Sequence, residues 1–138
     1  MTIDEPRVVE IHIPSELGFE KVAMVSASAI AQRVGLSKER LEDLKTAVAE
    51  ACINAIEHGN SLRVDVQVLI ILKADSQKVQ VSVIDNGHKP IPASVPDRAG
   101  RSDFRGMGMS LIYHLMDEVK IKSEPGRNEI QMIIKLKN

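Results

Sequence analysis

The chain has 138 residues, a length typical of one domain, and its 18 basic and 19 acidic residues give a formal net charge of −1. This balance argues against nucleic acid as a direct partner, because binding to the phosphate backbone needs an excess or a stripe of basic residues. The longest apolar run, Val68 to Leu72, is far too short to span a membrane, and the first residues show no secretory leader. A single cysteine, Cys52, excludes a disulfide scaffold and suits a reducing cytoplasm.

The first part of the chain predicts one strand and two helices. Alternating apolar residues over 7–13 indicate a half-buried strand, and Ser15 is placed to cap the helix that follows. That helix is expected to reach about residue 34, with an apolar face formed by Val22, Val25, Ala29 and Ile30. Ser37 is expected to cap a second helix that ends near Gly59. The apolar face of this second helix is expected to comprise Leu41, Leu44, Val48, Ala51, Cys52 and Ala55.

The rest of the chain predicts two hairpins separated by a loop and a short helix. Strands are expected over 63–73 and 78–86, around a turn at Asp75–Ser76, and over 119–123 and 129–137. Residues 87–105 are rich in Pro and Gly and lack periodicity, which predicts a long loop, and 106–116 predicts a buried helix. This order favours a single α+β domain over 1–138, a two-layer α/β sandwich with a mixed, mostly antiparallel sheet and helices on one face.

Polar residues recur along the edge of the second helix. Glu50, Asn54 and His58 are four residues apart, so they are expected to form one stripe beside the apolar face. A carboxylate and an amide oxygen one turn apart can share a hard cation or a water, whereas an ordinary solvated helix edge gives the same spacing. His58 also fits a cation at the end of a helix, and Cys52 fits the core.

Asp85 continues the odd-numbered parity of the preceding apolar residues, which predicts that its carboxylate points into the core. A buried carboxylate is costly unless hydrogen-bond donors meet it. Two interpretations remain open: a turn cap at Asn86–Gly87, or an acceptor for an amino group on a buried flat ligand.

The segment R-G-M-G-M over 105–109 joins the long loop to the next helix. Glycines at such a junction allow close approach of the backbone, and a helix N-terminus offers free amides to an anion, although a plain loop-to-helix junction has the same composition. The segment matches neither a Walker A loop nor a dinucleotide fingerprint. Met107, Met109 and Met116 fit core packing. The arginines of the loop, Arg98, Arg101 and Arg105, fit either solubility or a clamp for a phosphate or an acidic partner.

Three motifs occur together in one order on the expected elements. E-A-C-I-N-A-I-E-H-G over 50–59 resembles the N-box of the ATPase superfamily shared by gyrase, MutL and sensor histidine kinases, a Bergerat-type fold. D-N-G over 85–87 resembles its first glycine box, and R-G-M-G-M-S-L-I over 105–112 resembles its second. With H-L-M-D-E-V after the last box, the whole chain resembles an anti-sigma factor serine/threonine kinase of bacterial partner-switching systems.

The resemblance implies ATP and Mg²⁺ as cofactors and assigns roles to matching positions. Glu50 would act as the general base or align the attacking hydroxyl, and Asn54 would hold Mg²⁺ against the triphosphate. Asp85 would accept the adenine amino group, while Gly87 would let the chain pass against the base. Residues 88–105 would form the ATP lid. The phosphates would be bound at the end of the lid and the start of the next helix by Arg105, Gly106, Met107 and Gly108.

The same resemblance implies a cytoplasmic, homodimeric kinase with two protein partners. One is an antagonist protein that is phosphorylated on serine, and the other is a sigma factor that is sequestered. Two further hypotheses are a nucleotide-sensing binding module without phosphotransfer and a kinase domain for a phosphoacceptor histidine on another chain. Two departures from the family pattern are visible: His88-Lys89-Pro90 replaces a second glycine, and Arg127-Asn128-Glu129 replaces a Gly-Thr-Thr whose threonine supports the aspartate.

Overall fold

The computed structural model describes residues 5–91 and 104–136, and for residues 104–107 it describes the helical backbone. Within these ranges the sheet has five strands in the order β1-β2-β3-β5-β4, and every neighbouring pair is antiparallel. The elements in chain order are β1 (Arg7–Pro14), α1 (Glu20–Arg33), α2 (Lys38–Asn54), the π-helical turn η1 (Ala55–Gly59), β2 (Gln67–Ala74), β3 (Lys78–Asp85), α3 (Phe104–Leu115), β4 (Glu118–Glu124) and β5 (Arg127–Lys135).

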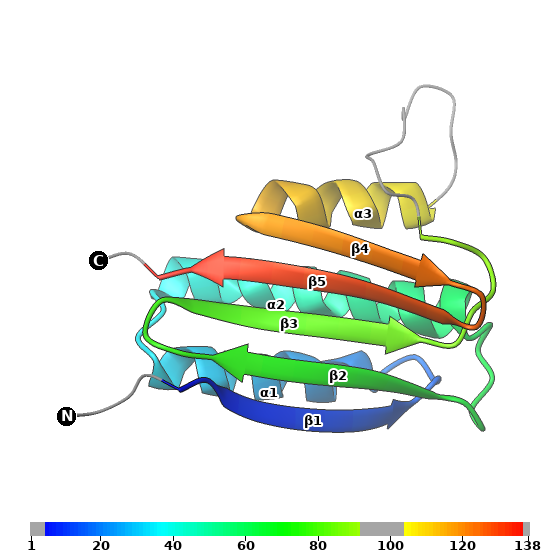
Figure 1. Ribbon diagram of the computed structural model, residues 1–138, viewed down its shortest axis with the longest axis horizontal. Coiled ribbons are helices and arrows are strands. Elements are labelled where there is room, and N and C mark those ends of the chain that lie inside the picture. Colours follow the sequence, from blue (N-terminus) through cyan, green and yellow to red (C-terminus); the bar gives the residue numbers. More distant parts are fainter. Residues whose placement is uncertain (1–4, 92–103, 137–138) are drawn as a thin grey trace.

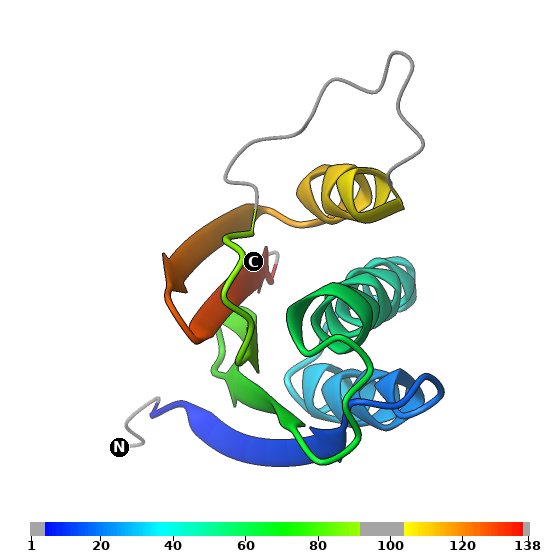
Figure 2. The ribbon, with the colours of Figure 1, turned by 90° about the vertical axis from the view of Figure 1, so that its right-hand side faces the viewer.

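The helices of the described ranges all lie on one side of the sheet, as the two ribbon views show (Figures 1 and 2). α2 lies between α1 and α3 and packs against both. The core between the layers is aliphatic, with Leu44, Val48, Ile70, Leu72 and Met132 fully enclosed. The expected two-layer α+β sandwich is therefore confirmed, and its described strand pairs are antiparallel throughout.

The second helix begins and packs as its sequence predicts. The Ser37 side chain accepts a hydrogen bond from the Arg40 amide at 3.3 Å, which caps the helix. The buried residues of α2 include Leu41, Leu44, Val48, Ala51 and Cys52, as expected from their spacing. The helix ends with a π turn before Asn60, so its last turn is wider than the α-helical pattern alone predicts.

The predicted apolar face of the first helix is wrong at Val22, Val25 and Ala29, which are exposed, and right at Ile30, which packs against the core. α1 buries Ala23, Ala27 and Ala31, whereas Val22 and Val25 are 46% and 67% exposed. Alanines spaced four residues apart form a flat stripe that lets α1 approach α2 closely, and this fit outweighs the larger apolar area of the valines.

The predicted cap at Ser15 is also wrong. α1 begins at Glu20, and the Ser15 hydroxyl is buried, where it donates to the Val66 carbonyl at 2.5 Å and accepts from the Asn60 amide nitrogen at 2.9 Å. β2 likewise begins at residue 67 rather than 63, because residues 60–66 form local turns, with Arg63 N bonded to Asn60 O at 3.0 Å. In the part of the chain that the structure describes, no helix has the length and apolar character needed to cross a membrane.

Candidate functional site

Helix α2 places Glu50 and Asn54 one turn apart on the side that faces α3. Both residues are half-buried, and the Asn54 amide nitrogen is fully enclosed with no hydrogen-bond partner among the described residues. Alanines 47, 51 and 55 surround this pair and are buried, so the side chains around it are short. A carboxylate and an amide oxygen therefore lie together at a close helix contact.

The third member of the predicted stripe does not join this pair. His58 lies in the π turn, is exposed, and lines a different cavity. A π turn rotates the following side chains away from the α-helical register, which explains why four-residue spacing failed to place His58 with Asn54.

Asp85 ends β3 with its side chain inside the protein, 3% exposed, which confirms the predicted inward parity. Its Oδ1 accepts hydrogen bonds from the Gly87 amide at 2.8 Å and from the Asn128 side-chain nitrogen at 3.2 Å. The bond to Gly87 is the turn cap expected from the D-N-G sequence. Donors thus meet this buried carboxylate, as its desolvation requires.

Two glycines allow the chain to pack directly on Asp85. A Cβ atom on Gly59 would lie 2.7 Å from Asp85 Oδ1, and its other nearest neighbours are atoms of the same carboxylate. A Cβ atom on Gly87 would lie 2.5 Å from the Gly59 carbonyl oxygen and 3.0 Å from Asp85 Oδ1. Gly59, at the end of the N-box, and Gly87, in the first glycine box, are therefore in backbone contact, and a side chain at either position would clash.

The second glycine box contacts the same region from α3. A Cβ atom on Gly108 would lie 3.0 Å from Glu50 Oε2 and 3.2 Å from Asn54 Nδ2. Gly106, Met107 and Arg105 occupy the first turn of α3, and their side chains lie outside the described residues, as does the lid segment 92–103. The structure thus brings Glu50, Asn54 and Gly108 together, while the roles assigned to positions 105–107 stay predictions.

A cavity of about 10 Å³ connects Asn54 to Asp85 between the helices and the sheet. It has room for about one water molecule. Its lining comprises Ala51, Asn54, Ala55, Val83, Asp85, Ile91, Met109 and Ile130. Met109 was expected in the core and is buried there.

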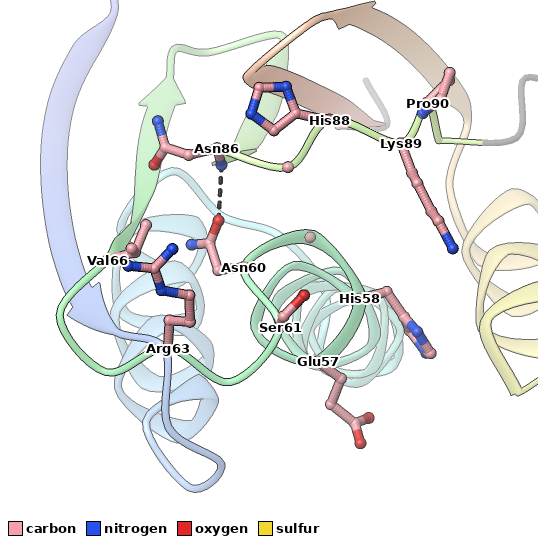
Figure 3. Close-up of a pocket in the computed structure, with 12 residues that line it drawn as sticks. Glu57, His58, Asn60, Ser61, Arg63, Val66, Asn86, His88, Lys89 and Pro90 are labelled. Atoms are coloured by element: carbon pink, nitrogen blue, oxygen red, sulfur yellow. Dashed lines mark hydrogen bonds between the residues drawn. The ribbon is translucent and has the colours of Figure 1, made fainter.

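A second, open cavity of about 780 Å³ lies at the end of α2, where Gly59 and Gly87 meet (Figure 3). Its lining includes the cationic side chains of Arg63 and Lys89, the imidazoles of His58 and His88, and one carboxylate, Glu57. In Figure 3 the Lys89 side chain extends from the segment after β3 toward the side of η1 that carries His58. The rim of this cavity is therefore polar and mainly basic.

Burial raises the pKa of the Glu50 carboxyl above its ordinary value, and the charge of Glu57 raises it further. A carboxylate with a raised pKa is a stronger base, which suits proton acceptance from a hydroxyl. No group of three or more His, Cys, Asp or Glu side chains able to hold a metal ion occurs within the described residues. A cation here would depend on the oxygens of Glu50 and Asn54 together with a ligand, which is the usual arrangement for Mg²⁺ with a nucleotide.

Two asparagines support Asp85 and its turn: Asn60 was not singled out from the sequence, and Asn128 was noted only as part of a departure from the family pattern. Asn128 lies directly opposite Asp85 in the β3–β5 register, and Asn60 Oδ1 accepts from the Asn86 amide at 2.8 Å. The signal for Asn128 was its even-numbered parity with Ile130, Met132 and Ile134, which placed it on the buried face of β5.

Comparisons with known proteins agree with this geometry. Residues 13–134 match the histidine kinase-like ATPase domain family. The serine-protein kinase RsbW of Halalkalibacterium halodurans is 30% identical over 135 residues, which cover 91% of this chain and 82% of that protein. The protein of the same name from Listeria innocua is 31% identical over 127 residues, covering 86% and 81%.

The fold also matches a solved structure, that of the RsbU and RsbW domains of Rv1364c from Mycobacterium tuberculosis, with a TM-score of 0.69 and 17% sequence identity. The match covers 93% of this chain and 32% of that one, so the likeness extends over one part of a longer protein. On the sequence matches and the shared fold, the chain belongs to the histidine kinase-like ATPase domain family and, within it, to the family of the RsbW serine-protein kinases.

Proposed function

We propose that this chain is an ATP-dependent serine protein kinase and anti-sigma factor of a partner-switching pathway. It phosphorylates an antagonist protein on serine and sequesters a sigma factor. The observation that carries the proposal is the meeting of Glu50 and Asn54 on α2 with Gly108 on α3, beside the cavity that ends at Asp85. The names of the relatives, which are serine-protein kinases, support the same activity.

Each part of the site has one task in this proposal. Asp85 accepts a hydrogen bond from the adenine amino group, and Gly87 gives the base access to the backbone. The phosphates lie near the start of α3, at Arg105, Gly106, Met107 and Gly108, where backbone amides face an anion.

Asn54 and the phosphates together suit Mg²⁺, whose oxygen ligands commonly include only one or two from protein. When bound, this ion neutralises charge on the triphosphate. The amide nitrogen of Asn54, buried without a hydrogen-bond partner among the described residues, is a donor and would suit a phosphate oxygen rather than the ion.

The transfer itself needs a base and a positioned hydroxyl. The serine Oγ of the antagonist attacks the γ-phosphorus of ATP, the bond to the β,γ-bridging oxygen breaks, and ADP leaves. The serine proton passes to the Glu50 carboxylate, whose pKa is raised by burial. Further parts of the proposal are a homodimer and a cytoplasmic location.

The direct test measures ATP binding by calorimetry in wild type, Asp85→Asn and the matched control Asp75→Asn. Asp75 lies in the β2–β3 turn, at the opposite end of β3 from Asp85, and an asparagine there can still accept from the turn amides. Loss of a charge-assisted hydrogen bond should weaken ATP binding by Asp85→Asn roughly 10- to 100-fold. The control should bind like wild type. Wild-type protein that fails to bind Mg·ATP at millimolar concentration would contradict the proposal.

The alternative is a nucleotide-sensing binding module without significant phosphotransfer. Both functions require ATP binding, so they differ only in whether label from γ-labelled ATP reaches a serine of the antagonist protein. Nucleotide binding without such transfer would favour the module.

A further inference from the structure

The backbone around Lys89 is anchored, although the chain has already left the sheet there. The Lys89 carbonyl accepts a hydrogen bond from the Asn128 side chain at 2.8 Å, and the Ile91 amide donates to the Ser123 hydroxyl at 3.1 Å. Pro90 lies between these two bonds, and a proline restricts both its own backbone and that of the residue before it. The segment that replaces a glycine of the family pattern is therefore tied to β5 and β4.

This anchored segment lies at the boundary between the two cavities. Gly87 packs on Asp85, and Ile91, which is 8% exposed, lines the inner cavity of about 10 Å³. Lys89 lies between these two positions, but its side chain is exposed and lines the outer cavity of about 780 Å³. A ligand that extends from Asp85 into the outer cavity therefore has Lys89 at its point of exit.

The ammonium group of Lys89 is available to such a ligand. In Figure 3 the side chain extends across the opening toward the side of η1 that carries His58. Among the described residues no carboxylate forms an ion pair with Lys89. Arg63, the other permanent cation of the lining, is paired with Asp65 at 3.3 Å. An unpaired cation on a fixed backbone suits a charged ligand, because little order is lost when the ligand binds.

The charge and size of the outer cavity fit an anion. Glu57 is the one carboxylate among the described residues that line it, against two permanent cations and two imidazoles. Its volume lies in the range of small-molecule sites, so a phosphate chain has room there.

We infer that Lys89 binds the phosphates that ATP and ADP share, where the nucleotide leaves the inner cavity. This inference rests on the proposed function, in which Asp85 accepts the adenine amino group. The ammonium donates a charge-assisted hydrogen bond to a phosphate oxygen. Because both nucleotides carry these phosphates, Lys89 strengthens the binding of substrate and product nucleotide alike. It takes no proton in the transfer.

The test measures the affinities of ATP and ADP by calorimetry in wild type, Lys89→Met, Lys89→Arg and the control Arg63→Met. Methionine keeps most of the apolar stem and removes the charge, so both nucleotides should bind about tenfold more weakly. Lys89→Arg keeps the charge and should recover most of the affinity. Arg63 lines the same cavity but lies across η1 from His58 in Figure 3, so Arg63→Met should bind like wild type.

Four results would overturn the inference. Unchanged affinities in Lys89→Met remove the contact, and a loss for ATP alone assigns the lysine to the γ-phosphate instead. An equal loss in Arg63→Met assigns the effect to the overall charge of the cavity. A loss in Lys89→Arg as large as that in Lys89→Met assigns it to packing.

A second measurement uses the wild-type protein and separates this inference from the proposed function. Acetic anhydride modifies exposed lysines, and mass spectrometry of peptides measures the rate at each one. ADP should slow the modification of Lys89 at least about threefold, because a lysine bound to phosphate is less accessible. Lys73, which is exposed on β2, is the internal reference and should react at an unchanged rate.

A wild type that binds both nucleotides and leaves Lys89 unprotected overturns the inference alone. A wild type that binds neither nucleotide contradicts the proposed function, and the inference is then wrong as well.

Discussion

Glu50, the base in the proposed reaction, lies in an environment that disfavours its charged form. Its pKa is raised by burial and by Glu57, so the ionised form is less favourable in the folded chain than in the unfolded one. At acid pH the carboxyl is protonated in both the folded and the unfolded state and costs the folded protein nothing. As the pH rises toward the raised pKa, the unfolded chain loses the proton first, so the free energy of unfolding falls. A residue that destabilises the protein at neutral pH and lies beside Asn54 fits a catalytic role.

Replacement of Glu50 by glutamine should therefore affect phosphotransfer, ATP binding and stability in different ways. Glu50→Gln should slow phosphotransfer to the antagonist by a factor on the order of 10²–10⁴, because the base is lost. It should bind ATP like wild type. Its free energy of unfolding, measured in urea, should exceed that of wild type at pH 7 and match it at acid pH.

The exposed Glu57→Gln is the comparison: it leaves the base in place and removes only the neighbouring charge that raises the Glu50 pKa, so its effects should be smaller than those of Glu50→Gln. Equal phosphotransfer rates in wild type and Glu50→Gln would remove Glu50 from the mechanism.

Among single residues, the sequence correctly predicted the side-chain positions that depend on the periodicity of one strand or one helix. Asp85 follows from strand parity, and Glu50 and Asn54 follow from helical spacing within α2. Asn128 does not follow from local periodicity, because its contact with Asp85 depends on strand pairing between residues 43 positions apart. The resemblance pointed to this position only as a departure from the family pattern.

At the scale of elements, the strands and helices were predicted in their order and approximate bounds. The errors occur where packing between elements, rather than the local sequence pattern, sets the buried face or the boundary of an element. The buried face of α1, which packs mainly on α2, consists of Ala23, Ala27 and Ala31, and the start of β2 is set by turns that end only at residue 67. His58 was misplaced because a π turn cannot be read from a spacing of four.

Helix α3 combines poor intrinsic stability with a close contact to the site. Gly106 and Gly108 lie in its first turns, and glycine costs a helix about 1 kcal/mol relative to alanine. α3 packs mainly on α2, with a small contact to β4. Its glycines therefore weaken the element that covers Glu50 and Asn54.

Alanine at position 108 should have opposite effects on stability and activity. Gly108→Ala should raise the free energy of unfolding by up to about 1 kcal/mol, because alanine favours the helix. Its methyl group would lie 3.0 Å from Glu50 Oε2, which forces the carboxylate to shift. Because small misplacements of a catalytic group are costly, phosphotransfer should fall on the order of 10²-fold.

The exposed His114→Ala, on the same helix, raises helix propensity without touching the site and is the matched control. Full activity in Gly108→Ala would show that the contact with Glu50 has no catalytic importance.

At the scale of the whole molecule, the size of the inner cavity determines how a nucleotide could bind. The space between Asn54 and Asp85 is about 10 Å³, which is enough for about one water molecule and too little for an adenine ring. Its walls come from α2, η1, α3, β3, β5 and Ile91, so an adenine ring that enters this space must displace some of them. We expect α3 to be the wall that moves, because it packs on α2 and makes only a small contact with β4.

Mg·ATP should thus stabilise the protein and change α3 more than the rest of it. At a free concentration of 100 times the dissociation constant, the gain in unfolding free energy should be about 2.7 kcal/mol, visible as a higher Tm. Amide hydrogen exchange should change in α3 and at Gly87, while the edge strand β1 serves as the internal reference. Equal changes in β1 and α3 would contradict a local opening at this helix.

Because the thiol of Cys52 is buried, we expect this protein not to respond directly to oxidants that react with thiols. Burial, reinforced by the nearby charge of Glu20, raises the pKa of Cys52 to about 12, so that the reactive thiolate is strongly disfavoured at neutral pH. It is the one cysteine of the chain. Peroxide and disulfide exchange therefore find no reactive thiol in the folded protein, and a thiol-based oxidative signal would have to reach it through the nucleotide supply or through a partner that carries its own sensor.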